Sequence, residues 1–211
     1  MTIQTKTVKK RWKELPKCYS EQEKKYIVNR LKEEAAKCLT QYGIKRTTVD
    51  ELVKRVKIPK GTFYLFYQSK EMLLFEVILE QHDKIEKQLY DALSGLNSKT
   101  VSCQQLTDLL FRFYKAAEEM PILKMMNSDE IEILERKLPE DVLARHLAHD
   151  NSMVENIFRL LSHKGREELE PFSAAFREIF FVMLHKEEFS QEYYDQGLKL
   201  LIKGLVMQLM K

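Results

Sequence analysis

The sequence contains few of the residues that interrupt helices or cross-link a chain. Among its 211 residues are only six glycines, five prolines and three cysteines. Scarce glycine and proline leave few places for turns, so we expect long helices and few connections. Cys18, Cys38 and Cys103 are odd in number and far apart, and none lies in a CxxC or Cys/His pattern. We therefore expect reduced thiols and no cysteine metal site.

Membrane-directed segments are also missing from the sequence. Residues 1–17 are polar and basic, without the apolar run of a signal peptide. The longest uncharged apolar stretch extends from Ile179 to Leu184, which is far too short to cross a bilayer. We therefore expect a cytoplasmic protein without a membrane partner.

Positive charge is concentrated at one end of the chain. Residues 1–70 hold 18 Lys and Arg against 7 Asp and Glu, whereas residues 71–211 hold 17 against 25. A basic end on a mildly acidic body is typical of a protein that binds a polyanion through that end. Within it, residues 1–19 form either a frayed terminus or a basic arm that adds phosphate contacts.

Capping signals and hydrophobic periodicity predict an all-α fold class. The capping box Ser20-x-x-Glu23 opens a helix that we expect to run to about Tyr42, with Gly43 just past its last turn. No strand-like alternation follows residue 70, and we expect about nine helices in two domains. Further helices are expected over residues 70–93, 102–119, 121–126, 128–136, 139–161, 171–186 and 191–210.

The stretch from Gly43 to Lys70 is predicted to form two short helices joined by a tight turn. Thr48-x-x-Glu51 begins the first as a capping box, and Pro59 ends it and starts the second. Small, basic and hydroxyl residues open the second helix. This pattern is typical either of a helix-turn-helix, whose second helix enters the DNA major groove, or of an αα-corner with an aromatic core.

Residues 20–77 resemble the DNA-binding domain of the TetR (tetracycline repressor) family of bacterial transcription regulators. Three positions depart from the family pattern: Lys57 replaces the usual turn glycine, Pro59 replaces a capping serine, and Phe66-Tyr67 reverses the common order. Glycine at position 57 would tolerate a left-handed conformation that lysine resists. The residues that carry the resemblance are Gly43, Thr48, Leu52, Val53, Ile58, Lys60-Gly61-Thr62-Phe63-Tyr64, Phe66-Tyr67, Ser69, Lys70 and Leu73.

The resemblance implies three regions. These are a basic arm over residues 1–19, a helix-turn-helix DNA-binding domain over 20–80 with the motif at about 47–66, and an effector-binding and dimerisation domain over 81–211. It implies a homodimeric transcription regulator in the bacterial cytoplasm, located on the nucleoid when bound to DNA. We expect a repressor that binds a palindromic double-stranded operator and is released by a small apolar or aromatic effector.

The resemblance also suggests roles for individual residues. Thr62 is the expected base contact, with Lys60 beside it, and Gly61 lets the backbone approach the DNA. Thr48 and Lys70 lie at helix N-termini, where phosphates are favoured, and Phe63, Phe66 and Tyr67 are expected mainly to pack. The residues expected to bind DNA are Arg46, Thr47, Thr48, Lys57, Lys60, Gly61, Thr62, Tyr64 and Lys70.

Two further sites are expected in the C-terminal domain. The last two helices are expected to form the dimer interface, with Phe172, Phe176, Ile179, Phe180, Met183, Gly197, Leu201, Gly204 and Leu205. An effector pocket is expected between the helix from Lys70 and those from Ser102 to Leu161, since flexible Met and aromatic side chains suit apolar ligands. Its lining would include Phe111, Phe113, Tyr114, Met120, Met125, Met126 and Phe158, although each has ordinary core packing as an alternative.

Two other classes of protein remain open. One is a DNA-bound adaptor that is regulated by a protein partner and has no small-molecule pocket. The other is an enzyme, but the five histidines accompany no nucleophile–base motif, phosphate loop or metal spacing, so we expect no enzyme and no cofactor. His146 and His149, three apart on a predicted helix, form either a metal pair with Asp141 or Asp150, or a surface pair.

Overall fold

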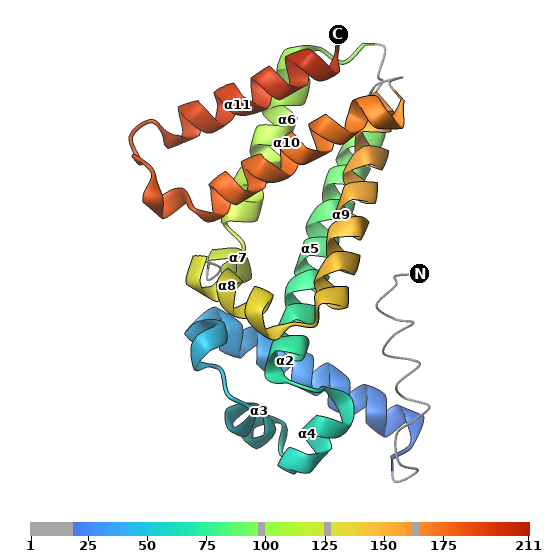
Figure 1. Ribbon diagram of the computed structural model, residues 1–211, viewed down its shortest axis with the longest axis vertical. Helices are drawn as coiled ribbons and strands as arrows, with labels where there is room; N and C mark the ends of the chain where they lie inside the picture. The colour runs from blue at the N-terminus through green and yellow to red at the C-terminus, as the bar shows by residue number, and fades with distance from the viewer. Residues whose placement is uncertain (1–18, 97–99, 125–127, 162–164) are drawn as a thin grey trace. The chain divides into compact units, whose positions relative to one another are not determined.

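The computed structural model describes residues 19–96, 100–124, 128–161 and 165–211 (Figure 1). Over these ranges the chain forms ten α-helices, α2 to α11, and one short 3-10 helix, and it contains no strand. The predicted all-α fold class is therefore confirmed. The chain divides into two compact units, of which the first ends at Glu80 and the second begins at Gln81.

Unit 1 is a small helical domain with its own core. Its helices are α2 (Glu21–Arg46), α3 (Val49–Val56), α4 (Lys60–Phe66) and the first part of α5 (Lys70–Ser94). The predicted box starts α2, because Ser20 N donates to Glu23 Oε2 (2.7 Å) and Glu23 N donates to Ser20 Oγ (3.2 Å). The side chains that fill the core include Leu31, Ala35, Cys38, Leu39, Ile44, Leu52, Phe63, Leu73 and Leu74.

Gly43 separates the body of α2 from a final turn. Its φ of 72° and ψ of −176° are not helical, so the segment that ends at Arg46 contains a kink at this residue. Only glycine adopts that region of backbone space without strain. The predicted glycine position after Tyr42 is thus confirmed, and the kink directs the chain into Thr48, which begins α3.

Unit 2 contains the remainder of α5 and six further α-helices. They are α6 (Cys103–Glu118), α7 (Pro121–Lys124), α8 (Ser128–Lys137), α9 (Glu140–Leu161), α10 (Arg166–Leu184) and α11 (Tyr194–Leu209), with a 3-10 helix at Lys186–Glu188. Helix α6 begins with a capping box formed by Ser102 and Gln105. Helix α6 packs against α11, α9 packs against α10, and α10 also contacts α11 and α6.

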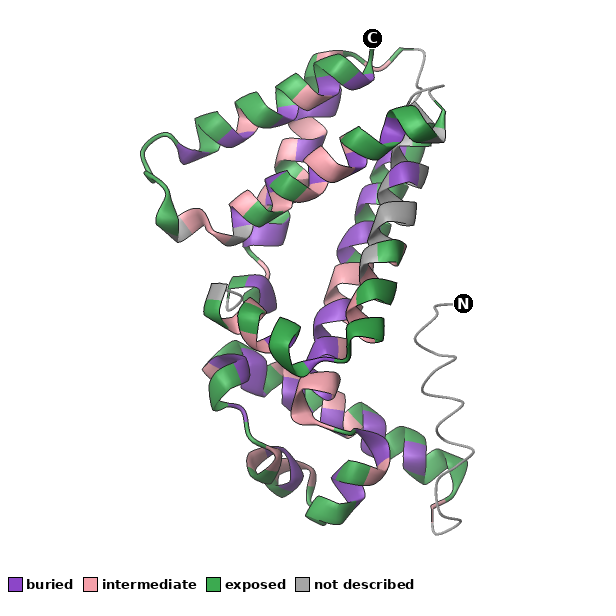
Figure 2. Cartoon of the chain, viewed as in Figure 1, coloured by how far each residue is buried: buried purple, intermediate pink, exposed green. Residues whose placement is uncertain are grey.

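The core of unit 2 is built from the apolar stripes of these helices. Helix α11 buries residues at helical spacing, from Tyr194 through Leu198 and Ile202 to Val206. Figure 2 shows α11 with its buried residues along one side and its exposed residues along the other. At the centre, the fully buried Tyr114 of α6 donates its hydroxyl to the Phe176 carbonyl of α10 at 2.7 Å.

The start of α10 differs from the prediction by five residues. The sequence suggested a start at Pro171, but the helix begins at Arg166 and contains Pro171 in its second turn. Leu169 is fully buried and so anchors the first turn in the core. The Gly165 N–H also donates to Glu168 Oε2 at 2.9 Å. Glycine has no side chain to complete a capping box, which is why the sequence signal was weak.

Candidate nucleic-acid interface

The turn between α3 and α4 uses a lysine in a left-handed conformation. Lys57 has φ 60° and ψ 47°, and among the described residues it alone combines a side chain with a positive φ. Its N–H donates to Lys54 O (3.3 Å), while the N–H of Ile58 donates to Val53 O (3.1 Å). These two bonds form a Schellman motif that ends α3. Lysine therefore adopts the conformation that the sequence led us to expect it to resist.

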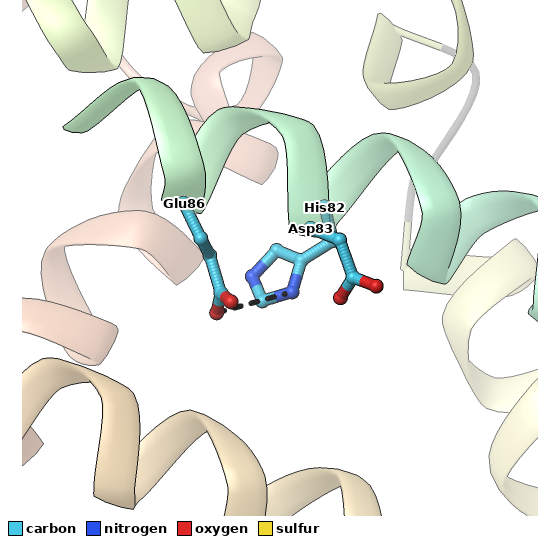
Figure 3. Close-up of side chains that lie close together, drawn as sticks. All are labelled: His82, Asp83 and Glu86. Carbon is cyan, nitrogen blue, oxygen red and sulfur yellow. Dashed lines mark ion pairs between the residues drawn. The ribbon is translucent and has the colours of Figure 1, made fainter. Parts of the chain in front are cut away.

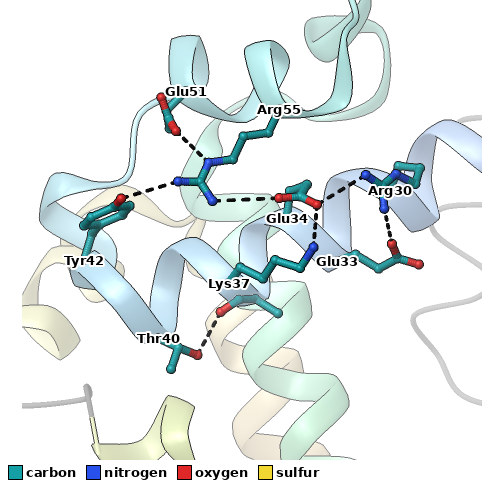
Figure 4. A network of polar contacts seen from close by, with 9 residues as sticks. Arg30, Glu33, Glu34, Lys37, Thr40, Tyr42, Glu51 and Arg55 are labelled. Atoms are coloured by element: carbon teal, nitrogen blue, oxygen red, sulfur yellow. Dashed lines mark hydrogen bonds and ion pairs between the residues drawn. The ribbon is translucent and has the colours of Figure 1, made fainter.

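A polar network joins α3 to α2 (Figure 4). The Arg55 Nε donates to Glu51 Oε1 at 2.6 Å, and its guanidinium also reaches Tyr42 Oη (3.4 Å). Arg55 Nη1 lies 3.8 Å from the buried carboxylate of Glu34, which also accepts from Lys37 Nζ at 2.7 Å. The hydrogen bond from Lys37 is the main reason that the pKa of Glu34 is lowered. Arg55 thus fixes the position of α3. The carboxylate of Glu51 points toward Arg55, and the Thr48 hydroxyl caps α3 by accepting from Glu51 N.

The aromatic residues of α4 divide between packing and exposure. Phe63, Phe66 and Tyr67 are buried, which confirms the prediction that they mainly pack. Tyr64 is 48% exposed, and its ring lies edge-on to that of Phe63 with centroids 5.3 Å apart. The buried rings hold α4 on the domain, so that its opposite side stays free for a partner.

The first turn of α4 presents a basic and open surface. Lys60 is exposed, and its Nζ lies 2.9 Å from Asp50 Oδ1 of α3. Gly61 is exposed too, and a Cβ built there would have no heavy atom within 4 Å. A rigid backbone such as that of DNA can therefore approach α4 closely at Gly61. Arg46, Thr48 and Lys57, three more of the predicted contacts, are also exposed.

Two predicted DNA contacts have buried side chains. Thr62, the expected base contact, is 6% exposed, and its Oγ1 lies 3.2 Å from Tyr19 Oη. Thr47 is 1% exposed, and its hydroxyl donates to Gly43 O at 2.6 Å, which closes the kink in α2. Sequence reasoning missed Tyr19 because it precedes the helices, and no periodic pattern relates it to Thr62.

Lys70 has a structural partner in addition to its predicted phosphate role. Its Nζ donates to Ile44 O at 2.5 Å and lies 3.6 Å from Glu71 Oε1. The ammonium thus joins the start of α5 to the last turn of α2. Ser69 caps the same end of α5, because its Oγ accepts from Met72 N at 3.2 Å.

The side chains predicted for an effector pocket largely pack against other helices. Phe113 stacks on Phe176 with ring centroids 6.2 Å apart, and Tyr114 is fully buried beside them. Phe111 lies under Lys199 Nζ, which is 5.5 Å from its ring centroid. Met120 is half-buried at the edge of the same core. Met125, Met126 and the side chain of Phe158 lie outside the described residues.

The residues predicted for a dimer interface also divide into two sets. Phe176, Ile179 and Met183 belong to the unit 2 core, because they lie on the inner side of α10. A shallow apolar groove lies between α10 and α11, and Ile179 contributes to it as well as to the core. Its lining residues are Pro171, Phe172, Ala175, Glu178, Ile179, Val182, Leu200, Leu201, Gly204, Leu205 and Gln208.

Several apolar side chains of α10 and α11 are exposed, and Leu200 and Leu201 among them line the groove. Leu200 is 69% exposed and Leu201 51%, while Phe181 of α10 is 46% exposed. Gly197 and Gly204 on α11 have open space where a Cβ would lie. Leu201 belongs to the predicted set, whereas Leu200 and Phe181 do not.

In unit 1, a short helix with an open first turn follows α3 through a Schellman turn; α3 packs on α2, and α4 packs on α3. This is the architecture of a helix-turn-helix protein. Residues 31–77 match the family model described as "Bacterial regulatory proteins, tetR family". The helix-turn-helix region of this chain is therefore similar to that of the TetR family of bacterial regulatory proteins.

Two curated relatives come from Bacillus subtilis (strain 168). The uncharacterised HTH-type transcriptional regulator YuxN is 28% identical over 123 residues, which cover 54% of this chain and 41% of YuxN. The uncharacterised HTH-type transcriptional regulator YdgC is 29% identical over 121 residues, which cover 52% of this chain and 62% of YdgC. The chain thus spans less than two thirds of either relative.

A crystal structure extends the similarity of fold to most of the chain. It is that of a protein from Mesorhizobium loti MAFF303099 assigned to the TetR family of transcriptional regulators. The two share 16% identity with a TM-score of 0.57, and the match covers 87% of this chain and 96% of the other. At this identity the match concerns the fold alone. Among the described residues, no helix is both long and apolar enough to span a membrane.

Proposed function

We propose that the protein is a DNA-binding transcriptional regulator that acts as a homodimeric repressor at a palindromic operator. The observation that carries this proposal is the open first turn of α4, where exposed Lys60, Gly61 and Tyr64 stand on a buried Phe63. In a helix-turn-helix, this turn is the part that reaches base edges and nearby phosphates. The basic composition of residues 1–70 supports binding to a polyanion.

Selection of bound DNA from a random pool at two salt concentrations tests this proposal. We expect a palindromic consensus whose half-sites lie about one helical turn apart, because a two-fold dimer presents two α4 helices to successive major-groove faces. Lys60→Ala should weaken binding, whereas Lys87→Ala should not, since the exposed Lys87 pairs only with its helical neighbour Asp91 in the contacts described (2.6 Å). Enrichment of no sequence, with steeply salt-dependent binding, would refute the proposal.

The groove between α10 and α11 supports dimerisation. Glycine within a helix costs about 1 kcal/mol relative to alanine, and no intramolecular neighbour requires one at Gly204 or Gly197. A second copy of the chain that approaches closely is the occupant we propose, because a self-complementary apolar surface suits a two-fold interface. Leu200, Leu201 and Phe181 would supply its apolar contacts.

Gly204→Leu tests this interface by sedimentation at several concentrations. We expect the variant to shift toward monomer while its helix content stays unchanged, since the protomer has room for the new side chain. Glu132→Leu, on an exposed position of α8, is the matched control for an added apolar side chain. A variant that remains a dimer with the affinity of the natural protein would contradict this placement.

A small apolar or aromatic effector that releases the DNA completes the proposal. A DNA-bound adaptor is the second candidate, and the tight packing of Phe113, Tyr114 and Phe176 favours it because these side chains fill the interior. A screen of apolar and aromatic compounds for loss of operator binding separates the two. Release by a compound that also raises the melting temperature would support the effector, whereas release only by a protein partner would support the adaptor.

A further inference from the structure

Three potential metal ligands lie on one side of helix α5, in the part of the helix that belongs to unit 2. His82, Asp83 and Glu86 each offer one ligand atom, and these three atoms all lie within 4.8 Å of one another. The closest approach joins His82 Nδ1 to Glu86 Oε1 at 3.4 Å. Figure 3 shows the imidazole of His82 between the carboxylates of Glu86 and Asp83. Spacing of four residues places His82 and Glu86 on the same face of a helix.

Helix α9 adds two imidazoles to this cluster. His149 Nε2 lies 3.7 Å from Glu86 Oε2, so the two oxygens of one carboxylate face imidazoles from two different helices. The ring of His146 lies edge-on to that of His82, with centroids 5.5 Å apart. The sequence had left open whether His146 and His149 form a metal pair with Asp141 or Asp150, or a surface pair. The structure instead pairs Asp141 with Arg145 at 2.8 Å and supplies the carboxylate from α5.

The spacing of these atoms suits a transition-metal ion. Ligands at about 2.0–2.2 Å from a tetrahedral zinc ion are roughly 3.3–3.6 Å apart. The separation of 3.4 Å between His82 Nδ1 and Glu86 Oε1 falls in that range, and His149 Nε2 lies 3.7 Å from the other Glu86 oxygen. Glu86 is only 6% exposed, so its carboxylate is already largely removed from bulk water. A buried carboxylate is stabilised when a cation binds to it.

We propose that His82, Asp83 and Glu86 of α5 bind a divalent transition-metal ion, with His149 of α9 as the fourth ligand. Two imidazole nitrogens and two carboxylate oxygens favour zinc, cobalt or nickel over magnesium or calcium, which prefer sites made of oxygens alone. His146 and Phe180, whose ring centroids lie 5.5 Å and 6.2 Å from that of His82, hold its imidazole in place. Metal binding would link α5 to α9 within unit 2.

Titration with Co²⁺ tests the site directly. The full-length protein is prepared without a histidine tag and treated with a chelator, and its visible absorption is then followed as Co²⁺ is added. We expect bands of four-coordinate Co²⁺ that saturate at one ion per chain and disappear when Zn²⁺ displaces it. We also expect the melting temperature to rise with the logarithm of the Zn²⁺ concentration. Absence of both signals would overturn the proposal and leave an ion-pair cluster.

Near-isosteric variants identify the ligands. His82→Gln, Glu86→Gln and His149→Gln are each expected to weaken Co²⁺ binding at least about tenfold, the scale seen when even outer-shell partners of metal sites are lost. His185→Gln is the matched control, because His185 Nδ1 forms a similar pair with Glu188 Oε1 (2.9 Å) at the end of α10. Binding that persists in the three variants, or that is lost in the control, would refute this assignment.

The proposed metal site and the proposed function can be refuted separately. Neither absorption nor metal-dependent melting involves DNA, so a negative result leaves the helix-turn-helix proposal intact. Conversely, a chain that selects no DNA sequence can still bind Co²⁺ at His82, Glu86 and His149. If any of the glutamine variants is poorly folded, the titration of the natural protein still decides whether a metal binds.

Discussion

Replacement of Lys57 by glycine should stabilise the helix-turn-helix. A residue with a side chain in the left-handed region is disfavoured by roughly 1–2 kcal/mol, and Lys57 adopts φ 60° and ψ 47°. Glycine removes this cost but loses about 0.4–1 kcal/mol through the greater freedom of its unfolded chain. The net gain in the free energy of unfolding should therefore be about 1 kcal/mol, or roughly 2–4 °C in the melting temperature for a chain of this size.

A control is needed because Lys57→Gly also removes a charge. Lys57→Ala removes the same ammonium but keeps a Cβ, so it should retain the left-handed strain and gain no stability. Urea unfolding followed by circular dichroism compares the two variants, and hydrogen exchange at the Ile58 amide, which donates to Val53 O at 3.1 Å, reports on the turn itself. Equal stability of the glycine and alanine variants would refute the claim that the turn is strained.

The same pair of variants tests the role of the turn in DNA binding. If the exposed Lys57 ammonium contacts a phosphate, both variants should reduce the slope of log affinity against log salt by about 0.9. Lys57→Gly relieves the backbone strain and also removes the charge. This variant should therefore be more stable than the natural protein while its DNA affinity is lower. Unchanged salt dependence in both variants would remove Lys57 from the proposed interface.

Three further predictions concern unit 1. Glu34→Gln should cost about 1–3 kcal/mol at neutral pH, as measured by urea unfolding. Because the pKa of Glu34 is lowered in the fold, its contribution is present above pH 4.5 and is lost as pH falls through the folded pKa, so a stability difference that does not shrink as the solution is acidified would contradict it. Lys70→Met removes the donor to Ile44 O and should lower the stability of unit 1, and it should weaken binding to all DNA sequences alike; a change in sequence preference would oppose this role. Gly61→Ala should stabilise the free protein by up to about 1 kcal/mol yet weaken DNA binding, and unchanged affinity in a binding titration would show that DNA does not approach there.

Local signals in the sequence predicted most helix boundaries. Ser20 and Ser102 begin helices through side-chain bonds to residues three positions later, and such bonds can be read from the sequence alone. The start of α10 could not be read in this way. It depends on Leu169, whose burial comes from helices distant in the sequence.

Side-chain positions that depend on tertiary packing were harder to predict. The reduced exposure of Thr62 involves Tyr19, which lies 43 residues earlier in the chain. The histidines of α9 were recognisable as a pair, but their partner Glu86 lies on another helix, and no spacing rule relates the two. Helical periodicity identified the apolar residues of α10, yet it did not tell the inward Phe176 from the outward Phe181, because both sides of that helix are apolar.

Some glycines of this chain are required by the backbone geometry of the protomer, and others are not. Gly43 is required by its own backbone, since its φ of 72° and ψ of −176° would strain any other residue. Gly61 and Gly204 instead lie within helices with no atom near the position of a Cβ, so alanine would make the isolated protomer more stable. Both lie on surfaces that we propose to be covered, one by DNA and one by a second copy of the chain. Packing within the protomer does not explain these two residues, whereas the proposed close approach of a partner would.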